Sequence, residues 1–244
     1  MRFVIFGGTT EARELSRLLA QKGGSVLVSV ATDYGREEQG EYPGVQVVVG
    51  RRTAREMEEL LADCTLCVDA THPYAQEVTA NIRTACERGK VPYRRLLRAE
   101  SSRREGLVVS NGVEAAAFLE KREGNVLLTT GTKELSAFDR LDRGRLYVRV
   151  LPSREGIAAC EERGIPHRNI IAMQGPFSKE LNAALLRQFS IRYLVTKDSG
   201  GLGGFLEKAE AARDTGAVLV VLRRPEEQGM DLMSILGECM RYLP

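Results

Sequence analysis

One short stretch of the sequence, residues 65–75, gathers side chains that could bind a ligand or move a proton. An apolar run ends at Asp69, and a polar turn with Thr71, His72 and Tyr74 follows it. His72 is one of only two histidines in the chain, and an imidazole exchanges protons near neutral pH. The alternative interpretation is an ordinary turn in which Asp69 caps the next helix.

A second candidate site is the sequence Gly7-Gly8-Thr9-Thr10-Glu11, which follows the apolar run at the N-terminus. Glycine lets a backbone approach a ligand closely, and amides at the start of a helix donate to phosphate oxygens. The pattern lacks the G-x-G-x-x-G spacing, and a tight turn between a strand and a helix needs glycine in any case. We expect Glu11 to face away from a diphosphate and to complement the helix dipole.

Polar residues also follow the second and third apolar runs, at Ala31-Thr32-Asp33 and at Gly50-Arg51. An acidic residue at the end of the second strand would normally bind the ribose diol of NAD. Here Asp33 comes one or two positions late, and arginine offers forked donors to a phosphate. The pattern therefore favours NADPH, although solvated arginines on an ordinary surface remain the alternative.

In the second half of the chain, three further apolar runs end in polar, turn-forming residues. One such loop is only a connection, but three at one edge of a sheet indicate a binding site, and glycine-rich loops admit ligand oxygens to backbone amides. The residues concerned are Thr130, Gly131, Lys133, Gln174, Gly175, Pro176, Phe177, Lys197, Asp198, Ser199, Gly200, Gly203, Gly204 and Lys208.

A basic cluster lies near the middle of the chain, at Arg94, Arg95, Arg98, Arg103 and Arg104. No aromatic residues interleave with it and no nucleic-acid-binding module accompanies it, so nucleic acid is not the expected partner. A small substrate with several carboxylates would explain arginines beside a binding site. Ordinary surface charge would explain them equally well.

These candidate sites fall at the ends of apolar runs that alternate with helical patterns. The expected strands are 2–6, 25–30, 45–49, 66–68, 91–93, 126–129, 146–150, 170–173, 191–196 and 218–222. The expected helices are 11–21, 53–62, 76–88, 113–121, 153–163, 178–188, 203–213 and 229–243. This alternation is typical of α/β proteins in which helices cover both faces of a parallel sheet.

The alternation lapses at residues 98–106, where we expect a domain boundary. The predicted fold class is α/β, with two Rossmann-like lobes, each containing a parallel sheet, and a cleft between them. Residues 1–98 would form an N-terminal dinucleotide-binding lobe, and residues 99–244 a C-terminal α/β substrate-binding lobe. A cleft between two lobes is the usual place for a cofactor and a substrate to meet.

Composition sets the remaining limits. The chain has 244 residues and a net charge of +2, and no apolar run approaches the roughly 20 residues that span a bilayer. Because the N-terminus leads directly into an expected strand, we expect no signal peptide. Five scattered cysteines do not form a disulfide framework, and Cys64 and Cys67 lack the partners of a zinc site. We expect a cytoplasmic protein without a metal, either a monomer or a weak homo-oligomer.

Taken together, the motifs resemble the precorrin-6A reductase family, which includes the cobalt-precorrin-6A reductases of corrin-ring biosynthesis. The resemblance runs in the right order along almost the whole chain, without a missing block. The matching pieces are Gly7 to Arg13, Ser29 to Thr32, Gly50-Arg51, Asp69 to Ala75, Arg95, Thr130-Gly131, Arg149 to Pro152, Gln174 to Phe177, Thr196 to Gly200, Gly203-Gly204, Glu207-Lys208 and Arg224-Pro225.

The resemblance implies an enzyme that uses NADPH to reduce one double bond of a macrocyclic tetrapyrrole, a step of cobalamin (vitamin B12) biosynthesis. The expected cofactor-binding residues are Gly7, Gly8, Thr9, Thr10, Glu11, Ala31, Thr32, Gly50, Arg51, Asp69, Thr71 and His72. The substrate carries acetate and propionate arms, for which Arg95, Arg98, Lys133 and Lys197 are the expected partners, together with the glycine-rich loops of the second half. His72, Tyr74, Lys197 and Asp198 are the candidate proton donors.

Two other functions share some of these features. A methyltransferase with an adenosyl cofactor would have a similar glycine turn, and a non-enzymatic dinucleotide sensor would use the first lobe alone. Tyr193 and Lys197 have the spacing of a catalytic pair of short-chain dehydrogenases, but that pair requires a helix. On a strand, four residues span about 13 Å, so that family is excluded.

Overall fold

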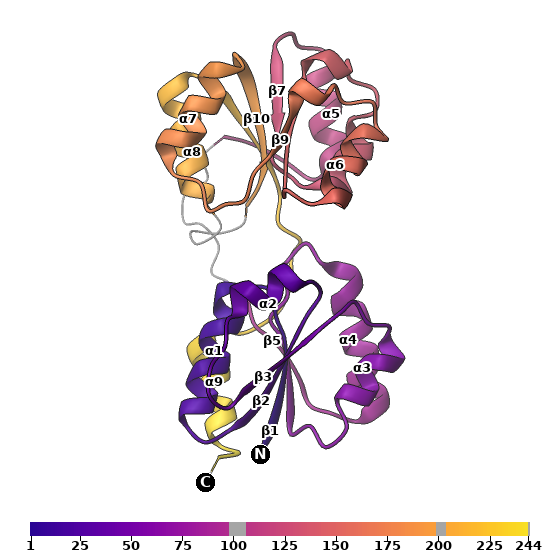
Figure 1. Ribbon diagram of the computed structural model, residues 1–244, viewed down its shortest axis with the longest axis vertical. Helices are drawn as coiled ribbons and strands as arrows, with labels where there is room; N and C mark the ends of the chain where they lie inside the picture. Colours follow the sequence, from indigo (N-terminus) through magenta and orange to yellow (C-terminus); the bar gives the residue numbers. More distant parts are fainter. Residues whose placement is uncertain (98–105, 199–203, 244) are drawn as a thin grey trace. The chain divides into compact units, whose positions relative to one another are not determined.

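The computed structural model describes residues 1–97, 106–198 and 204–243. The chain divides into two compact units, one of Met1–Ala99 with Pro225–Pro244 and one of Glu100–Arg224 (Figure 1). The first break matches the boundary expected near residue 98. The assignment of residues 225–244 to the C-terminal lobe is wrong, because this segment packs into the core of the first unit through Ile235 and Cys239.

The sheet of the first unit contains five parallel strands in the order β3-β2-β1-β4-β5. Their apolar, β-branched sequences suit strands that are buried on both faces. The order reverses between β1 and β4, and ligands bind parallel sheets at the carboxyl ends of the strands beside such a reversal. The strands are β1 (Arg2–Phe6), β2 (Ser25–Val30), β3 (Val45–Val49), β4 (Leu66–Asp69) and β5 (Tyr93–Arg95).

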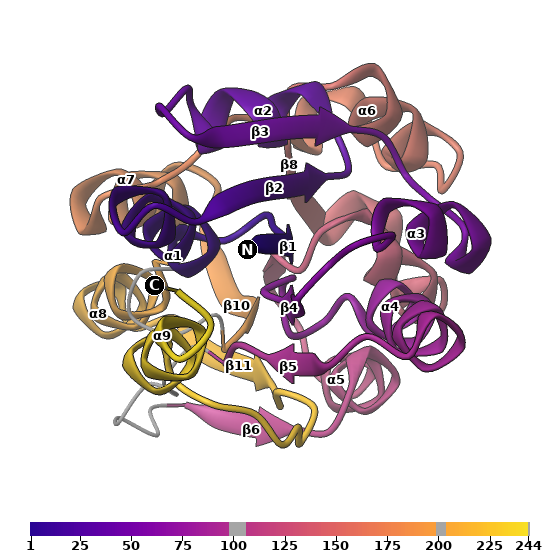
Figure 2. The ribbon, with the colours of Figure 1, turned by 90° about the horizontal axis from the view of Figure 1, so that it is seen from below.

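Helices cover both faces of this sheet. One face carries α1 (Thr10–Gln21) and α9 (Leu232–Met240), and the other carries α3 (Ala54–Leu60) and α4 (Gln76–Gly89) (Figure 2). Leu15 and Leu19 of α1 are fully buried. Truncating one such leucine to alanine typically costs 2–5 kcal/mol, roughly, in stability. These buried leucines thus fix α1 against the sheet.

The second unit has a parallel sheet in the order β6-β11-β10-β7-β8-β9. In Figure 1, α5 and α6 lie on one side of it and α7 and α8 on the other. The strands are β6 (Leu107–Val109), β7 (Asn125–Leu128), β8 (Leu146–Val150), β9 (Ile170–Ala172), β10 (Ile191–Lys197) and β11 (Val218–Leu222). The helices are α5 (Gly112–Glu120), α6 (Arg154–Glu161), α7 (Lys179–Gln188) and α8 (Phe205–Thr215), with short 3-10 turns η1 (Thr132–Phe138), η2 (Arg143–Arg145) and η3 (His167–Asn169).

The predicted fold class, α/β with two Rossmann-like parallel sheets, is confirmed. The sequence missed α2 (Asp33–Gln39) because its charged residues carry no apolar stripe, and it missed β6 because that strand has only three residues. The strand expected at 91–93 is Tyr93–Arg95. The two arginines of β5 have carboxylate partners, because Arg95 contacts buried Asp69 and Arg94 contacts Glu238.

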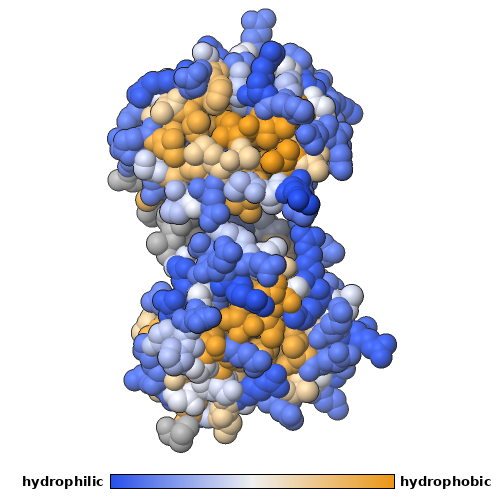
Figure 3. Space-filling model, viewed as in Figure 1, coloured by the Kyte–Doolittle hydropathy of each residue, from blue (hydrophilic) through white to orange (hydrophobic). Residues whose placement is uncertain are grey.

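The surface combines charged rims with apolar areas. Figure 3 shows apolar surface on each unit in the region of the edge strands β3 and β9. Within the ranges that the structure describes, no helix combines the length and the apolar character needed to cross a bilayer.

Candidate functional site

The turn between β1 and α1 leaves space beside its backbone. Gly8 has φ +121°, and a Cβ at this position would meet no atom within 4 Å. A Cβ at Gly7 would instead lie 2.9 Å from Cγ1 of Val28. Gly8 therefore opens the turn toward solvent, while Gly7 allows the turn to pass close to β2.

Thr9 is used by the fold rather than left open to a ligand. Its Oγ1 donates to the carbonyl of Ala70 at 2.9 Å and accepts from the amide of Ala12 at 3.2 Å. The hydroxyl thereby caps α1 and ties the turn to the end of β4. What the turn offers a ligand is the amino end of α1, a helix of 12 residues with Glu11 in its first turn. Its amides and dipole suit a diphosphate.

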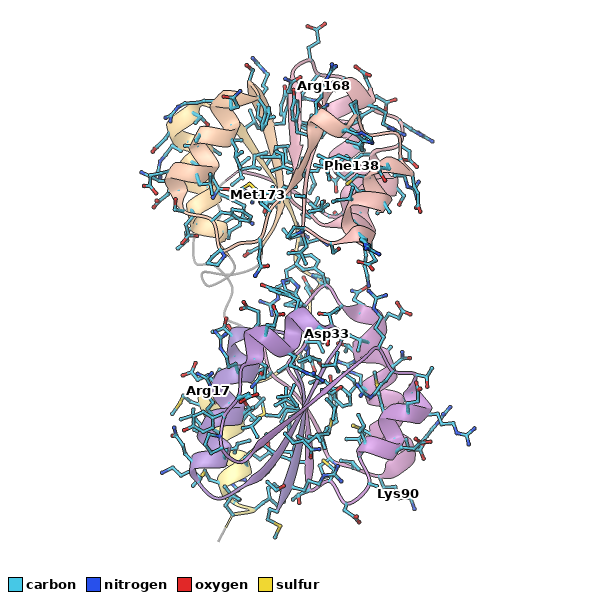
Figure 4. All side chains as sticks on the ribbon, viewed as in Figure 1. Arg17, Asp33, Lys90, Phe138, Arg168 and Met173 are labelled. Carbon is cyan, nitrogen blue, oxygen red and sulfur yellow. The ribbon has the colours of Figure 1, made fainter. Side chains whose placement is uncertain are left out.

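The residues expected at the ribose end are exposed. Ala31 and Thr32 lie at the end of β2, and Asp33 begins α2 (Figure 4). The Oγ1 of Thr32 accepts from the amide of Gly35 at 3.1 Å and so caps α2. Its hydroxyl can still donate to a ligand.

Of the two arginines after β3, only Arg51 is exposed. Arg52 folds back onto its own strand, because its Nη1 donates to Ser29 Oγ at 3.1 Å and to the Gly50 carbonyl at 2.8 Å. Its Nη2 donates to the Val49 carbonyl at 3.1 Å. Arg51 is consequently the arginine that could reach a phosphate at this edge of the sheet.

Asp69 does not face a ligand. Its side chain is 0% exposed, and Oδ1 accepts from the amide and the hydroxyl of Thr71 at 3.0 and 2.7 Å. Oδ2 accepts from the hydroxyls of Thr79 at 2.8 Å and Tyr93 at 3.1 Å. The side chain of Asp69 therefore offers no exposed surface for the cofactor contact expected from the sequence, since both oxygens hold the turn and α4. Burial of the Tyr93 hydroxyl, and next the negative charge of Asp69, raise the pKa of this hydroxyl.

Arg95 is also committed to the fold. It is 3% exposed, and its Nη1 lies 2.8 Å from Oδ1 of Asp69 and 2.9 Å from the Thr71 carbonyl. Its Nε and Nη2 donate to Oε2 of Glu227 at 3.2 and 2.9 Å. Two carboxylates thus occupy the guanidinium, which leaves little of it for the substrate carboxylate expected from the sequence. Glu227 was missed because it is 132 positions away along the chain.

The turn itself retains two accessible side chains. Thr71 is buried, while the rings of His72 and Tyr74 are half-buried, with centroids 5.5 Å apart. The Nδ1 of His72 accepts from the amide of Tyr74 at 3.4 Å. Because β1 and β4 are adjacent and parallel, this turn and the Gly7-Gly8 turn belong to one edge of the sheet.

In the second unit, two basic side chains are buried near the strand ends. Arg149 of β8 is 8% exposed, and its Nη1 donates to Oδ1 of Asn182 at 2.8 Å. Its Cζ lies over the ring of Phe177, 3.9 Å from the ring centroid. Lys208 of α8 is also 8% exposed. Burial lowers the pKa of Arg149 to about 10, and burial followed by the nearby Arg149 lowers the pKa of Lys208 to about 7.

Other groups at this edge are polar. Lys197 lies 3.3 Å from Oε1 of Glu134, and Asp198 is half-buried. The hydroxyl of Thr130 is buried and has no hydrogen-bond partner among the described residues. A buried donor without a partner costs about 1–3 kcal/mol, so a ligand oxygen would satisfy it. The sequence analysis included Arg149 in a matching motif but did not predict it as a binding residue, because its apolar neighbours indicate a buried strand.

The remaining predicted residues vary in position. Gly131, with φ +80°, and Lys133 are exposed, as are Gln174 and Pro176. Gly204 caps α8 in the left-handed region. The predicted residues Arg98, Ser199, Gly200 and Gly203 lie outside the described part of the chain.

Comparison with known proteins identifies the family. The family model for precorrin-6x reductase CbiJ/CobK matches residues 2–242. The chain belongs to the precorrin-6x reductase family. The resemblance inferred from the sequence motifs is thereby confirmed, and the parallel sheets and the open β1–α1 turn are those of a Rossmann-like reductase. Such a reductase implies a nicotinamide dinucleotide cofactor.

Individual relatives agree with the family match. A cobalt-precorrin-6A reductase of Priestia megaterium is 34% identical over 248 residues, covering 98% of this chain and 97% of that protein. One from Salmonella typhimurium is 36% identical over 229 residues, covering 91% of this chain and 87% of the relative. A solved structure described as CobK precorrin-6A reductase has a TM-score of 0.76 and 24% identity, covering 99% of this chain and 97% of the other.

Proposed function

We propose that this chain reduces one carbon–carbon double bond in the macrocycle of precorrin-6A, with NADPH as the hydride donor, in cobalamin biosynthesis. The family match over residues 2–242 carries this proposal. The cobalt-loaded macrocycle is the first substrate to test, because the relatives at 34–36% identity are named cobalt-precorrin-6A reductases. The metal-free macrocycle is the second.

The first unit would hold the dinucleotide. The open turn at Gly8 and the amino end of α1 fit a diphosphate. The ribose end favours NADPH over NADH, because exposed Arg51 offers a forked donor to a 2′-phosphate. Ala31 and Thr32, at the end of β2, carry no charge that would repel this phosphate.

The second unit would hold the macrocycle through its carboxylate arms. Buried Arg149 and Lys208 are suited to anionic oxygens, as is the hydroxyl of Thr130, which has no partner in the described ranges. Lys133, exposed beside this edge, is a further candidate. Within the described part of the chain, Arg149 has the neutral partners Asn182 and Phe177, so a substrate carboxylate would balance its positive charge.

The chemistry divides between cofactor and protein. Bound NADPH supplies a hydride to one carbon of the reduced double bond, and a proton goes to the neighbouring carbon. This chain has to orient the two reactants, exclude water and deliver the proton. His72 and Tyr74 in the first unit and Lys197 and Asp198 in the second remain the candidate donors, and all four are half-buried.

We propose that the enzyme works in the cytoplasm, as a monomer or a weak homo-oligomer. All five cysteines are free thiols, and four of them are buried. Unpaired thiols suit a reducing compartment.

Anaerobic incubation of the protein with each macrocycle and each dinucleotide tests the proposal. We expect NADPH absorbance to fall in step with a change in the macrocycle spectrum, and NADH to react far more slowly. Reaction products should gain one hydride per NADPH consumed, which mass spectrometry with deuterated NADPH detects. A folded preparation that reduces neither macrocycle would contradict the assignment.

A further inference from the structure

The C-terminal segment returns to the first unit beside the candidate cofactor turn. Met230 forms a parallel bridge with Leu96, its amide donates to the Arg95 carbonyl at 2.9 Å, and its carbonyl accepts from Leu97 at 2.9 Å. Gly229 passes so close to β5 that a Cβ there would lie 2.7 Å from the Arg95 carbonyl oxygen. The returning segment thus has one narrow path along β5, and that path places Glu227 against Arg95.

Arg95 joins Glu227 to the backbone of the 69–75 turn. Its Nη1 donates to the carbonyls of Asp69 and Thr71, at 3.1 and 2.9 Å, one on each side of Ala70. The carbonyl of Ala70 in turn accepts from Thr9 Oγ1 at 2.9 Å. A continuous set of contacts therefore leads from Glu227 to the turn that would hold a diphosphate.

We propose that Glu227 and Arg95 are positioning residues for the dinucleotide, acting through the backbone of residues 69–71 and through Thr9. This inference rests on the proposed function. Glu227 accepts from both Nε and Nη2 through one oxygen, and its side chain is 10% exposed. Such a two-donor contact fixes the plane of the guanidinium, and the plane decides where Nη1 meets the two carbonyls.

The charge on Glu227 is needed because Arg95 has only one other carboxylate partner among the described residues, Asp69. If Glu227 is neutral, the guanidinium is free to turn toward Asp69 and release the Thr71 carbonyl. The turn would then lose its fixed geometry, although the hydrophobic core of the unit would not change. A turn without this geometry would hold the diphosphate more weakly, and a 10- to 100-fold loss of affinity corresponds to about 1.4–2.8 kcal/mol.

The test compares Glu227→Gln with the neighbouring control Glu226→Gln. Glu226 is exposed, and the contacts that Arg95 makes with described residues do not include it. For Glu227→Gln we expect the KM for NADPH to rise by roughly 10- to 100-fold while the KM for the macrocycle stays unchanged. Hydrogen exchange of the amides of residues 71, 72, 74 and 75 should become faster in this variant, whereas Glu226→Gln should match the wild type in both measurements.

A purely structural role would lower the melting temperature without changing the KM for NADPH or the exchange of these amides, and that result would overturn the inference. Should Glu227→Gln fail to fold, Glu227→Asp keeps the charge on a shorter side chain and should give a smaller increase in the NADPH KM. An unchanged KM in a folded Glu227→Asp and Glu227→Gln pair would also overturn it. If the wild type does not bind NADPH at all, the proposed function fails instead, and NADPH fluorescence titration separates these outcomes.

Discussion

Each unit of the molecule buries an arginine near the carboxyl ends of its strands, but the two arginines have different surroundings. Arg95 contacts two carboxylates at 2.8 and 2.9 Å. Arg149 contacts the neutral side chains of Asn182 and Phe177 and lies near a second cation, Lys208. The contrast teaches that a buried arginine with its charge balanced holds the fold, whereas one without a balancing carboxylate is suited to bind an anion.

The largest expected effect is on the stability of the first unit. Arg95→Met would leave buried Asp69 and half-buried Glu227 without their cation, and breaking a buried pair in this way costs about 3–5 kcal/mol. Urea unfolding should show this loss. If Arg95→Met proves as stable as the wild type, Arg95 does not hold the fold.

The corresponding change in the second unit should affect binding rather than stability. Arg149→Met removes a buried charge that has no carboxylate partner among the described residues, so the free energy of unfolding should be unchanged or higher. The KM for the macrocycle should rise by roughly 10- to 100-fold, because a hydrogen bond to a charged group contributes about 1.5–3 kcal/mol. A stability loss as large as that of Arg95→Met, with normal kinetics, would remove the contrast between the units.

A smaller effect is expected at the ribose end of the first unit. Arg51→Ala should raise the KM for NADPH by about tenfold and leave the KM for NADH unchanged, since the loss concerns only the 2′-phosphate. Arg52→Ala is an informative comparison because Arg52 is held by its own strand. Equal effects on NADPH and NADH in Arg51→Ala would show that Arg51 does not contact the phosphate.

The smallest effect, taken per pH unit, is on the pH dependence of stability. The pKa of Lys208 falls from 10.5 to about 7 in the folded chain, so between these pH values the unfolded chain carries a proton that the folded chain lacks. Stability contributed by this site therefore rises with pH above 7, by at most about 1.4 kcal/mol per pH unit. Lys208→Met should abolish that slope in urea unfolding at pH 7 to 9. An identical slope in wild type and variant would show that Lys208 stays charged when buried.

Much of the fold and part of the candidate site could be predicted from the sequence. The apolar runs and glycine turns indicated the parallel sheets and the turns at Gly8 and Gly131. Short-range patterns could not show that the side chains of Asp69 and Arg95 bond to other parts of the protein. Asp69 accepts from Tyr93 and Arg95 donates to Glu227, and both partners come from distant positions in the sequence. For the same reason the C-terminal helix was predicted, but its membership of the first unit was not.

Arg149 illustrates the opposite case. It lies inside an apolar strand, and sequence periodicity assigns such a position to the core. Only the packing shows that its guanidinium meets Asn182 and the ring of Phe177 rather than a carboxylate. The identity of neighbours in space, not the type of residue, decides which arginine is structural.

The most direct test measures the macrocycle and NADPH KM values of Arg149→Met and Glu227→Gln side by side in the anaerobic assay. The account predicts a crossed pattern, in which Arg149→Met raises only the macrocycle KM and Glu227→Gln raises only the NADPH KM. If both variants raise the same KM, or if each raises both equally, the division of labour between the two units is contradicted.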